Sequence, residues 1–180
     1  AASDVYKRQN KVLIYAGGGW QKTTLKGTPK PSSISSDGAY SAGLRYFVTP
    51  EWALDFSVNR SGTHGIHANG SKVGSYKLTS YSLAVQYHFR AAERVKLYAG
   101  VGAGYFRSDQ QDFKEGWGAK KDIFTPVIQA GGTVAITRNL HVTGGMDLGF
   151  PRYKAHSPTD DSFSMRPSPV TFKLALGLAF

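Results

Sequence analysis

The sequence predicts an all-β protein of one domain, built from about eight antiparallel strands. Apolar and polar residues alternate with a period of two over long stretches, as they do where successive side chains point to opposite faces of a strand. Glycine, β-branched and aromatic residues are spread along the whole chain of 180 residues. Short and long connections alternate between these stretches, which favours hairpins joined in one continuous series.

Length and composition exclude several other classes. The chain is long enough for one core and too short for two large domains. No window approaches the roughly 18 consecutive apolar residues of a membrane helix. The hydrophobic residues, 41% of the total, recur in periodic runs, which argues against disorder. Without cysteine no disulfide framework exists, and despite the net charge of +10 there is no basic stripe or base-stacking module for nucleic acid.

The first nine residues are set apart from the rest. Residues 4–9 resemble the in-frame translation of a transposase end, and residues 1–9 lack the hydrophobic stretch of a signal peptide. We expect a non-native or disordered leader over 1–9 and a single domain over 10–180. The alternative is an ordinary frayed N-terminus.

The first four expected strands share one design. Residues 11–20 (KVLIYAGGGW) form an apolar run, and residues 38–48, 52–59 and 81–89 alternate between a bulky apolar face and a small or polar face. The bulky faces carry Tyr40, Ala42, Leu44, Tyr46 and Val48, then Trp52, Leu54, Phe56 and Val58, then Tyr81, Leu83, Val85, Tyr87 and Phe89. The opposite faces are mostly serine, alanine and glycine, with Arg45, Asp55 and His88 among them.

The last four expected strands continue the pattern over residues 95–105, 123–136, 140–150 and 170–180. Their bulky faces carry Leu97 and Val101, then Ile128, Val134 and Ile136, then Leu140, Val142, Met146, Leu148 and Phe150, then Val170, Phe172, Leu174, Leu176, Leu178 and Phe180. Glycine and alanine dominate the opposite faces, which also hold Lys96, Asp147 and Lys173.

The connections indicate a transmembrane β-barrel. Tight turns are expected at 49–51, 90–94 and 137–139, and polar loops at 21–37, 60–73, 108–122 and 151–166. Each strand approaches the roughly 9 to 11 residues that a tilted strand needs to cross a bilayer. We therefore predict an eight-stranded antiparallel barrel with short periplasmic turns and long extracellular loops, closed so that no strand edge meets lipid.

A soluble barrel of the lipocalin type is the alternative, since it also alternates. Such a barrel turns its apolar face inward and needs a polar surface outside. The polar faces here are too small for a water-facing surface, because positions such as Gly100, Gly102, Gly131 and Gly177 suit the packing of a narrow lumen. Aromatic residues fall near strand ends, where girdles meet lipid headgroups. These features favour the membrane barrel.

Several segments resemble the OmpW family of outer-membrane barrels. They are Tyr46 to Leu54 (YFVTPEWAL), His64 to Ile66 (HGI), Tyr87 to Phe89 (YHF) and Tyr98 to Tyr105 (YAGVGAGY). The C-terminal run with Leu176, Leu178 and Phe180 resembles the terminal signal by which outer-membrane barrels are recognised for assembly. The resemblance covers residues 12–180.

The resemblance implies a place and a function. It implies the bacterial outer membrane, with the membrane lipids, lipopolysaccharide and the barrel assembly machinery as partners, and no cofactor. It also implies passive uptake of small hydrophobic molecules, received at the loop end and released sideways into the membrane. A structural or adhesive barrel of the OmpA or OmpX type would use the same strands, and a filled lumen without a hydrophobic opening would distinguish it.

Charged residues on the inward faces predict a polar plug of Arg45, Asp55, His88, Lys96, Asp147 and Lys173. Pairing about Pro50 places Arg45 opposite Asp55. Pairing about the next turn places His88 near Lys96, and Asp147 and Lys173 lie at similar heights. A plug of this kind either gates the lumen or only stabilises the barrel.

A hydrophobic passage and an exit are also expected. Tyr98, Phe106 and Val127 are the candidate lining of the upper lumen. Pro126, Pro167 and Pro169 are candidates for a lateral exit, because proline removes a hydrogen bond from the strand ladder. The alternative is that these prolines only mark strand ends.

Neither catalysis nor metal binding is expected. His156 and Ser157 are adjacent in a loop and have no acidic third member. His64 and His67 have a metal-like spacing but no further ligand nearby. Basic residues of the loops and their edges are expected to face lipopolysaccharide phosphates; they are Lys22, Lys26, Lys30, Arg60, Lys72, Arg152, Lys154 and Arg166.

Overall fold

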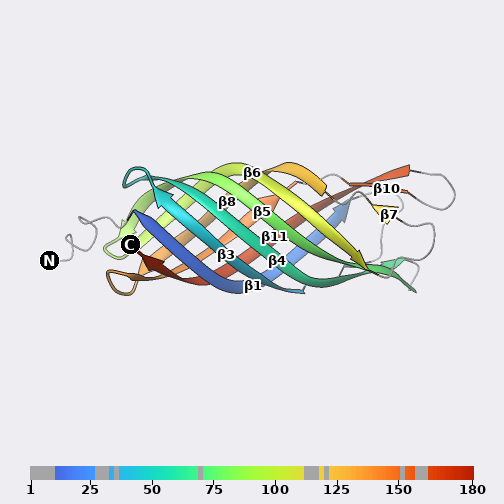
Figure 1. The fold of residues 1–180 in the computed structure, drawn as a ribbon, viewed down its shortest axis with the longest axis horizontal. Helices are drawn as coiled ribbons and strands as arrows, with labels where there is room; N and C mark the ends of the chain where they lie inside the picture. Colours follow the sequence, from blue (N-terminus) through green and yellow to red (C-terminus); the bar gives the residue numbers. More distant parts are fainter. Residues whose placement is uncertain are drawn as a thin grey trace.

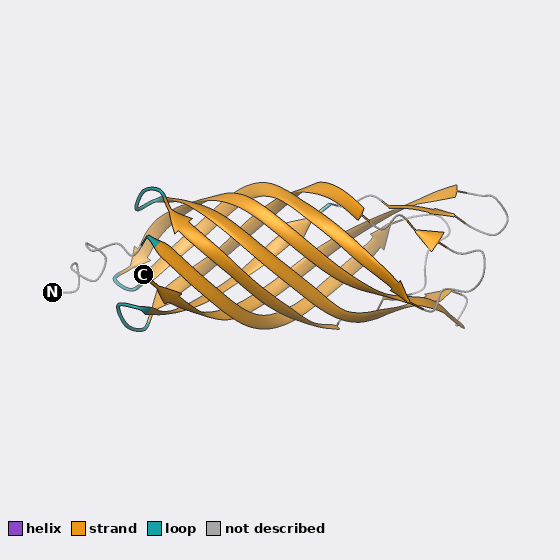
Figure 2. Cartoon of the chain, in the orientation of Figure 1, coloured by secondary structure: helices purple, strands orange, loops and turns teal. Residues whose placement is uncertain are grey.

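The structure is a computed structural model that describes residues 11–26, 33–34, 37–68, 71–111, 118–119, 122–150, 153–156 and 162–180. These residues form strands and short turns, without a helix among them (Figure 2). Accordingly, none of the described segments is a helix long and apolar enough to span a membrane. The expected leader over 1–9 lies outside the described residues.

The predicted eight-stranded antiparallel barrel is confirmed. Its strands are β1 (Val12–Lys26), β3 (Asp37–Phe47), β4 (Trp52–Ala68), β5 (Ser71–Ala92), β6 (Val95–Gln111), β8 (Asp122–Ala135), β9 (Leu140–Gly149) and β11 (Ser162–Ala179). Each pairs with the next, and β1 also pairs with β11, so that the ring is closed. Three short strands add to it: β2 (Ser33–Ile34) beside β4, β10 (Tyr153–His156) beside β11, and β7 (Gly118–Ala119) beside β10.

The two ends of the barrel differ in their connections. The short turns lie at the end where β1 begins and the chain finishes, and the extra strands β7 and β10 lie at the other end (Figure 1). Two of the turns are built alike, since Thr49 Oγ1 accepts a 3.0 Å hydrogen bond from the backbone N–H of Trp52, and Thr137 Oγ1 accepts one of the same length from that of Leu140. In barrels of this kind the short-turn end faces the periplasm.

The barrel is apolar outside and polar inside. Leu174 and Leu176 on the outer face are 64% and 62% exposed, whereas Arg45 and Asp55 on the inner face are completely buried. Water would penalise this arrangement, since it leaves a continuous apolar surface uncovered. Surrounding hydrocarbon favours it, because the polar side chains find partners within the lumen.

The strands reach further into the predicted loops than expected. Most of the expected loop 60–73 is strand, since β4 continues to Ala68 and β5 begins at Ser71. Similarly, β1 extends to Lys26, and β11 begins at Ser162, so that Pro167 and Pro169 lie within a strand rather than ahead of it. The loop prediction followed the change to polar side chains. The backbone ladder needs no apolar side chains, however, and continues through it.

Candidate functional site

A buried ion pair joins β3 and β4 inside the barrel, in the half of the lumen nearer the short turns. Arg45 and Asp55 are register partners, as predicted, and Arg45 Nε lies 3.0 Å from Asp55 Oδ1. The Tyr15 hydroxyl of β1 donates a hydrogen bond of 2.9 Å to Asp55 Oδ2. Arg45 Nη1 donates one of 3.2 Å to Thr133 Oγ1 on β8, across the ring. Four strands, β1, β3, β4 and β8, are thus linked through one guanidinium and one carboxylate.

Two tyrosine rings flank the Arg45 guanidinium. Its Cζ lies 4.5 Å from the ring centroid of Tyr98 and 5.5 Å from that of Tyr15. Cation–π contacts of this kind favour the charged guanidinium in a site without bulk water. The rings fit because the facing positions are glycine: a Cβ on Gly43 would collide with the Tyr15 ring, and one on Gly145 would collide with the Tyr98 hydroxyl.

A second ion pair lies between β9 and β11. Lys173 Nζ is 2.9 Å from Asp147 Oδ2, and both side chains are buried. Lys173 Nζ also lies 5.8 Å from the ring centroid of Tyr15, whose hydroxyl binds Asp55. The two ion pairs therefore share Tyr15 as a common neighbour.

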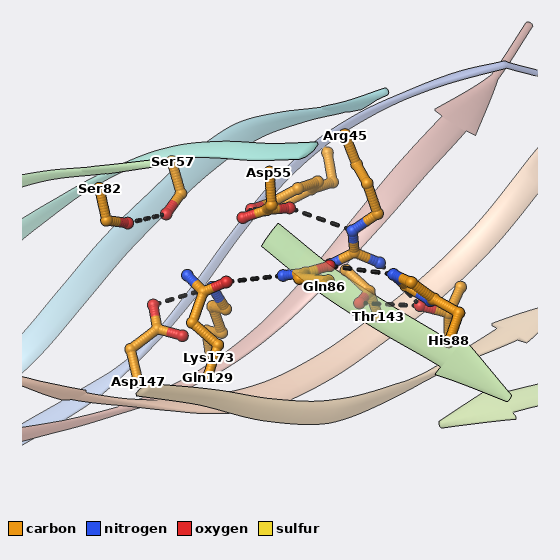
Figure 3. A network of polar contacts seen from close by, with 12 residues as sticks. Arg45, Asp55, Ser57, Ser82, Gln86, His88, Gln129, Thr143, Asp147 and Lys173 are labelled. Atoms are coloured by element: carbon orange, nitrogen blue, oxygen red, sulfur yellow. Dashed lines mark hydrogen bonds and ion pairs between the residues drawn. The ribbon is translucent and has the colours of Figure 1, made fainter. Parts of the chain in front are cut away.

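A chain of hydrogen bonds between uncharged side chains lies beside the two ion pairs (Figure 3). Together with the ion pairs, these side chains form a layer across the lumen, called here the polar level. Gln86 Nε2 of β5 donates to Gln129 Oε1 of β8 over 2.6 Å, and His88 Nε2 lies 3.0 Å from Gln86 Oε1. Because the Gln86 amide already donates through its nitrogen, its oxygen is the acceptor, and His88 donates from Nε2. Nearer the loop end, the hydroxyls of Ser57 and Ser82 lie 2.7 Å apart.

Apolar layers lie on both sides of the polar level. At the short-turn end Leu13, Tyr15, Ala175 and Ala179 form a buried cluster, with Phe47 packed against it. At the loop end Leu78, Phe106 and Val127 form another. The Phe106 ring reaches across to β9, because a Cβ on Gly149 would meet its Cζ at 2.7 Å.

The interior is therefore filled rather than open at its middle. The inward side chains described at this level are buried and bonded to one another, and they include both signs of charge. Such a layer can hold the walls together and can block water and ions. No group of three or more potential metal ligands occurs among the described residues.

One predicted pairing of the plug differs from the observed register. Four of its members, Arg45, Asp55, Asp147 and Lys173, form the two buried pairs, but Lys96 is not directly opposite His88. The register pairs Lys96 with Arg90 and His88 with Tyr98, because the turn lies at residues 93–94, further along the chain than the centre of the expected turn 90–94. Lys96 lies at the rim, where its Nζ donates a 3.4 Å hydrogen bond to the carbonyl of Pro50.

The expected passage residues separate into two levels. Phe106 and Val127 lie together at the loop end, but Tyr98 belongs to the polar level, against Arg45 and His88. The three prolines lie in the strands that flank β9. Pro126 of β8 is exposed on the outer face opposite Ala103, and Pro167 and Pro169 of β11 pair with Leu25 and Thr23.

Other predicted positions lie on the surface or outside the described part. Leu176, Leu178 and Phe180 point outward and are exposed, and their role in assembly stays a prediction. Ser157 and the side chains of His64, His67 and His156 lie outside the described residues.

Five residues of the polar level were not singled out from the sequence: Tyr15, Gln86, Gln129, Thr133 and Thr143. Gln86 and Gln129 could have been noticed as large polar residues on otherwise small faces. Tyr15 lies in an apolar run without clear alternation, so its direction was not visible. Thr133 and Thr143 gave no such signal, since threonine is common in strands.

Removing the Tyr15 hydroxyl is expected to weaken this level. In Tyr15→Phe, Asp55 keeps Arg45 but loses a hydrogen bond to a charged acceptor, with a cost of about 1.5–3 kcal/mol in the free energy of unfolding. Urea titration in lipid vesicles followed by tryptophan fluorescence measures this. Tyr46→Phe, on the exposed outer face, is the control and should change stability little. Equal losses in both variants would contradict a specific contribution of the Asp55 bond.

The match to a family model and the fold together give the class of this protein. Residues 3–89 match the family model described as outer membrane protein beta-barrel domain. Together with the closed ring and the apolar outer face, this match defines an eight-stranded outer-membrane β-barrel, located in the outer membrane of a bacterium. No curated protein sequence matches the chain.

Solved structures of outer-membrane proteins share the fold. The chain is similar to OprG from Pseudomonas aeruginosa, with a TM-score of 0.71, 14% identity and coverage of 96% of this chain and 97% of OprG. It is similar to AlkL, with a TM-score of 0.69, 16% identity and coverage of 96% and 92%. It is also similar to E. coli outer membrane protein W, with a TM-score of 0.58, 18% identity and coverage of 96% and 98%. The OmpW-like barrel expected from the sequence motifs is thus confirmed at the level of the fold.

Proposed function

We propose that this barrel mediates passive uptake of small hydrophobic molecules, which enter at the loop end and leave sideways into the membrane. The observation that carries the proposal is the division of the lumen into an apolar upper level and a filled polar level beneath it. A solute that reaches Phe106 and Val127 finds apolar contacts there. Further descent would bring it against buried charges, which an apolar molecule cannot solvate.

The end of β9 supports a sideways exit at this height. The ladder between β8 and β9 ends at the pair Val127 and Gly149, and that between β9 and β11 ends at Leu148 and Val170. Pro126 and Pro169 are the next residues of the two flanking strands. Proline has no backbone N–H to donate, so the wall is weakened where the short strand stops.

The Phe106 side chain lies on the lumen side of this proposed exit. Its ring lies against Gly149, the last residue of β9, and against the position of Gly104 on its own strand. Both glycines leave space that a side chain would otherwise occupy. We infer that rotation of this ring opens the way from the upper lumen to the seam beside β9.

Uptake by whole cells tests the proposal, because the lipopolysaccharide leaflet is the barrier to apolar solutes. Cells without their own OmpW-like protein would express the full chain, and entry of a medium-chain alkane would be timed against entry of a sugar. Faster entry of the alkane alone is expected. No acceleration of either solute in protein shown to be folded by its heat-dependent gel shift would favour a purely structural or adhesive barrel. Accelerated sugar entry would indicate a small polar pore.

Two variants locate the exit. Phe106→Ala removes the covering ring and should raise the alkane entry rate severalfold, whereas the double variant Pro126→Val, Pro169→Val restores ladder donors and should lower it. Val85→Ala is the control, since Val85 faces lipid on β5 and not on the strands that flank β9. Unchanged uptake in the double proline variant would contradict an exit beside β9.

A further inference from the structure

Three buried side chains on the loop-end side of the polar level carry a polar atom that has no hydrogen-bond partner among the described residues. The atoms are Ser41 Oγ of β3, Asn59 Oδ1 of β4 and Thr125 Oγ1 of β8. Ser41 and Asn59 are 5% exposed and Thr125 is 6% exposed. A buried polar atom without a partner raises the free energy of the folded state, so such atoms are rare in native structures and indicate a use.

The strands place these three residues in one section of the lumen. Ser41 and Asn59 are register partners, so their Cβ atoms lie about 5 Å apart. Ser41 lies on the face of β3 that carries Arg45, and Thr125 lies on the face of β8 that carries Gln129, both nearer to the loop end. The strands β3 and β8 belong to opposite sides of the ring. The unpaired atoms therefore lie where a solute that enters from the loop end meets the polar level.

The two sides of this section differ in polarity. From β3 to β5 the wall carries hydroxyl and amide groups, since Ser41 lies opposite Asn59, and Asn59 Nδ2 donates a hydrogen bond of 3.5 Å to Ser80 Oγ. On β6 and β8 the buried side chains of Phe106 and Val127 pack together in an apolar cluster. The lumen thus offers polar groups on one side and apolar contacts on the other, as an amphiphilic molecule requires.

The Phe106 ring lies beside the third unpaired atom. Thr125 is the register partner of Gly104, and a Cβ on Gly104 would meet the Phe106 ring at 2.8 Å. Thr125 also directly precedes Pro126, which belongs to the proposed exit. The rotation of the ring that opens this exit therefore uncovers the Thr125 hydroxyl to the departing solute.

We propose that the preferred solute is an uncharged amphiphile, namely an alkyl chain that ends in a hydroxyl group. Ser41 and Asn59 bind the head group, and Phe106 and Val127 contact the chain. This inference rests on the proposed uptake function and names the solute class of the same lumen. Asn59 Oδ1 only accepts a hydrogen bond, whereas the Ser41 hydroxyl donates or accepts one. An alcohol can satisfy both atoms, an ether only accepts, and an alkane does neither.

An ionised head group does not suit this place. The two ion pairs of the polar level already match each charged side chain with its opposite. A carboxylate or an ammonium group would lose its hydration without gaining a counter-ion. The neutral character of Ser41, Asn59 and Thr125 therefore favours an alcohol over a fatty acid or an alkylamine.

Three solutes of equal carbon number test the head group. They are 1-decanol, its isomer dipentyl ether, and decane. Cells without their own OmpW-like protein would express the full chain, and entry of each labelled solute at low concentration would be compared with entry into cells that lack the protein. The protein should accelerate 1-decanol severalfold more than the other two. Equal acceleration of all three would overturn the alcohol site and leave the uptake function standing, whereas no acceleration of any would overturn both.

Variants that remove the unpaired atoms locate the site. Ser41→Ala and Asn59→Leu should each lower the ratio of 1-decanol entry to decane entry about threefold, which corresponds to the loss of one hydrogen bond between uncharged groups. Ser41→Ala should also unfold at the same urea concentration as the wild type or a higher one, since it deletes a buried hydroxyl that has no partner among the described residues.

Ser57→Ala is the matched control on the same face of β4. The Ser57 hydroxyl is already paired with that of Ser82 (Figure 3), so this variant should unfold at a lower urea concentration and keep the wild-type ratio. An unchanged ratio in both Ser41→Ala and Asn59→Leu would overturn the proposal. A loss of stability in Ser41→Ala equal to that in Ser57→Ala would do so as well, because the Ser41 hydroxyl would then be satisfied without a solute.

Discussion

Arg45→Ala is expected to lower the free energy of unfolding by about 3–5 kcal/mol, because it leaves the Asp55 carboxylate buried without its counter-cation. The same change removes the hydrogen bond to Thr133 and the cation–π contacts with Tyr15 and Tyr98. Urea titration of the folded protein in lipid vesicles measures the loss.

Two controls make this result specific. Arg94→Ala removes an exposed arginine from a turn and should change the stability by less than about 0.5 kcal/mol. The double variant Arg45→Leu, Asp55→Leu removes both charges and should recover much of the loss, since well-packed apolar residues often replace a buried ion pair without cost. A double variant as unstable as the single one would show that the lost charge is not the cause.

Ion conductance decides between a stabilising and a gating role for the same residue. In planar bilayers Arg45→Ala should conduct no more than the wild type, because Gln86, Gln129 and Lys173 still fill the polar level. A clear rise in conductance with unchanged stability would instead assign Arg45 to a gate.

Gly145→Val is the second change expected to have a large effect. A Cβ at this position would collide with the Tyr98 hydroxyl and lie 2.9 Å from the carbonyl oxygen of Ala130. Tyr98 would have to move away from the Arg45 guanidinium, so strain and the loss of a cation–π contact add up. Overpacking of this kind costs about 1–3 kcal/mol, and the backbone contact places this case at the upper end.

The neighbouring residue provides a matched control. A Cβ on Gly144 would meet only the tip of Leu174 at 3.6 Å and the carbonyl of Lys173 at 3.7 Å, which are ordinary contact distances. Gly144 belongs to the outer face, where valine suits both the strand and the lipid. Gly144→Val should therefore be neutral or stabilising in the same titration. If both variants lose stability equally, the cause is the backbone and not the filling of the lumen.

The architecture could be predicted from the sequence because alternation fixes the two faces of each strand. For Tyr40 to Tyr46 or Phe172 to Phe180, every second residue is apolar and all but Ala42 are large, and the structure exposes these residues as expected. The ends of the strands were harder to predict from the sequence. The ladder continues over polar residues such as Lys26 and Ser71, whose side chains carry no signal of the backbone bonds that extend the strand.

The interior was predictable only where one hairpin determines the contact. Arg45 and Asp55 follow from a tight turn with regular pairing on both sides. The turn at residues 93–94 lies further along the chain than expected, so His88 is opposite Tyr98 and not Lys96. Contacts across the lumen, such as Arg45 with Thr133, depend on the stagger of the whole ring, which no local pattern reveals.

Because β1 pairs with β11, the barrel is closed only when all eight strands are present. Removing the last strand would not give a smaller pore, because it would uncover two rows of backbone donors and acceptors at once, one on β1 and one on β9. Hydrocarbon offers those rows no partner. It would also remove Lys173 and leave Asp147 as a solitary buried anion. A chain cut short by even one strand should therefore remain outside the membrane, where proteases would meet an unassembled polypeptide rather than a damaged channel.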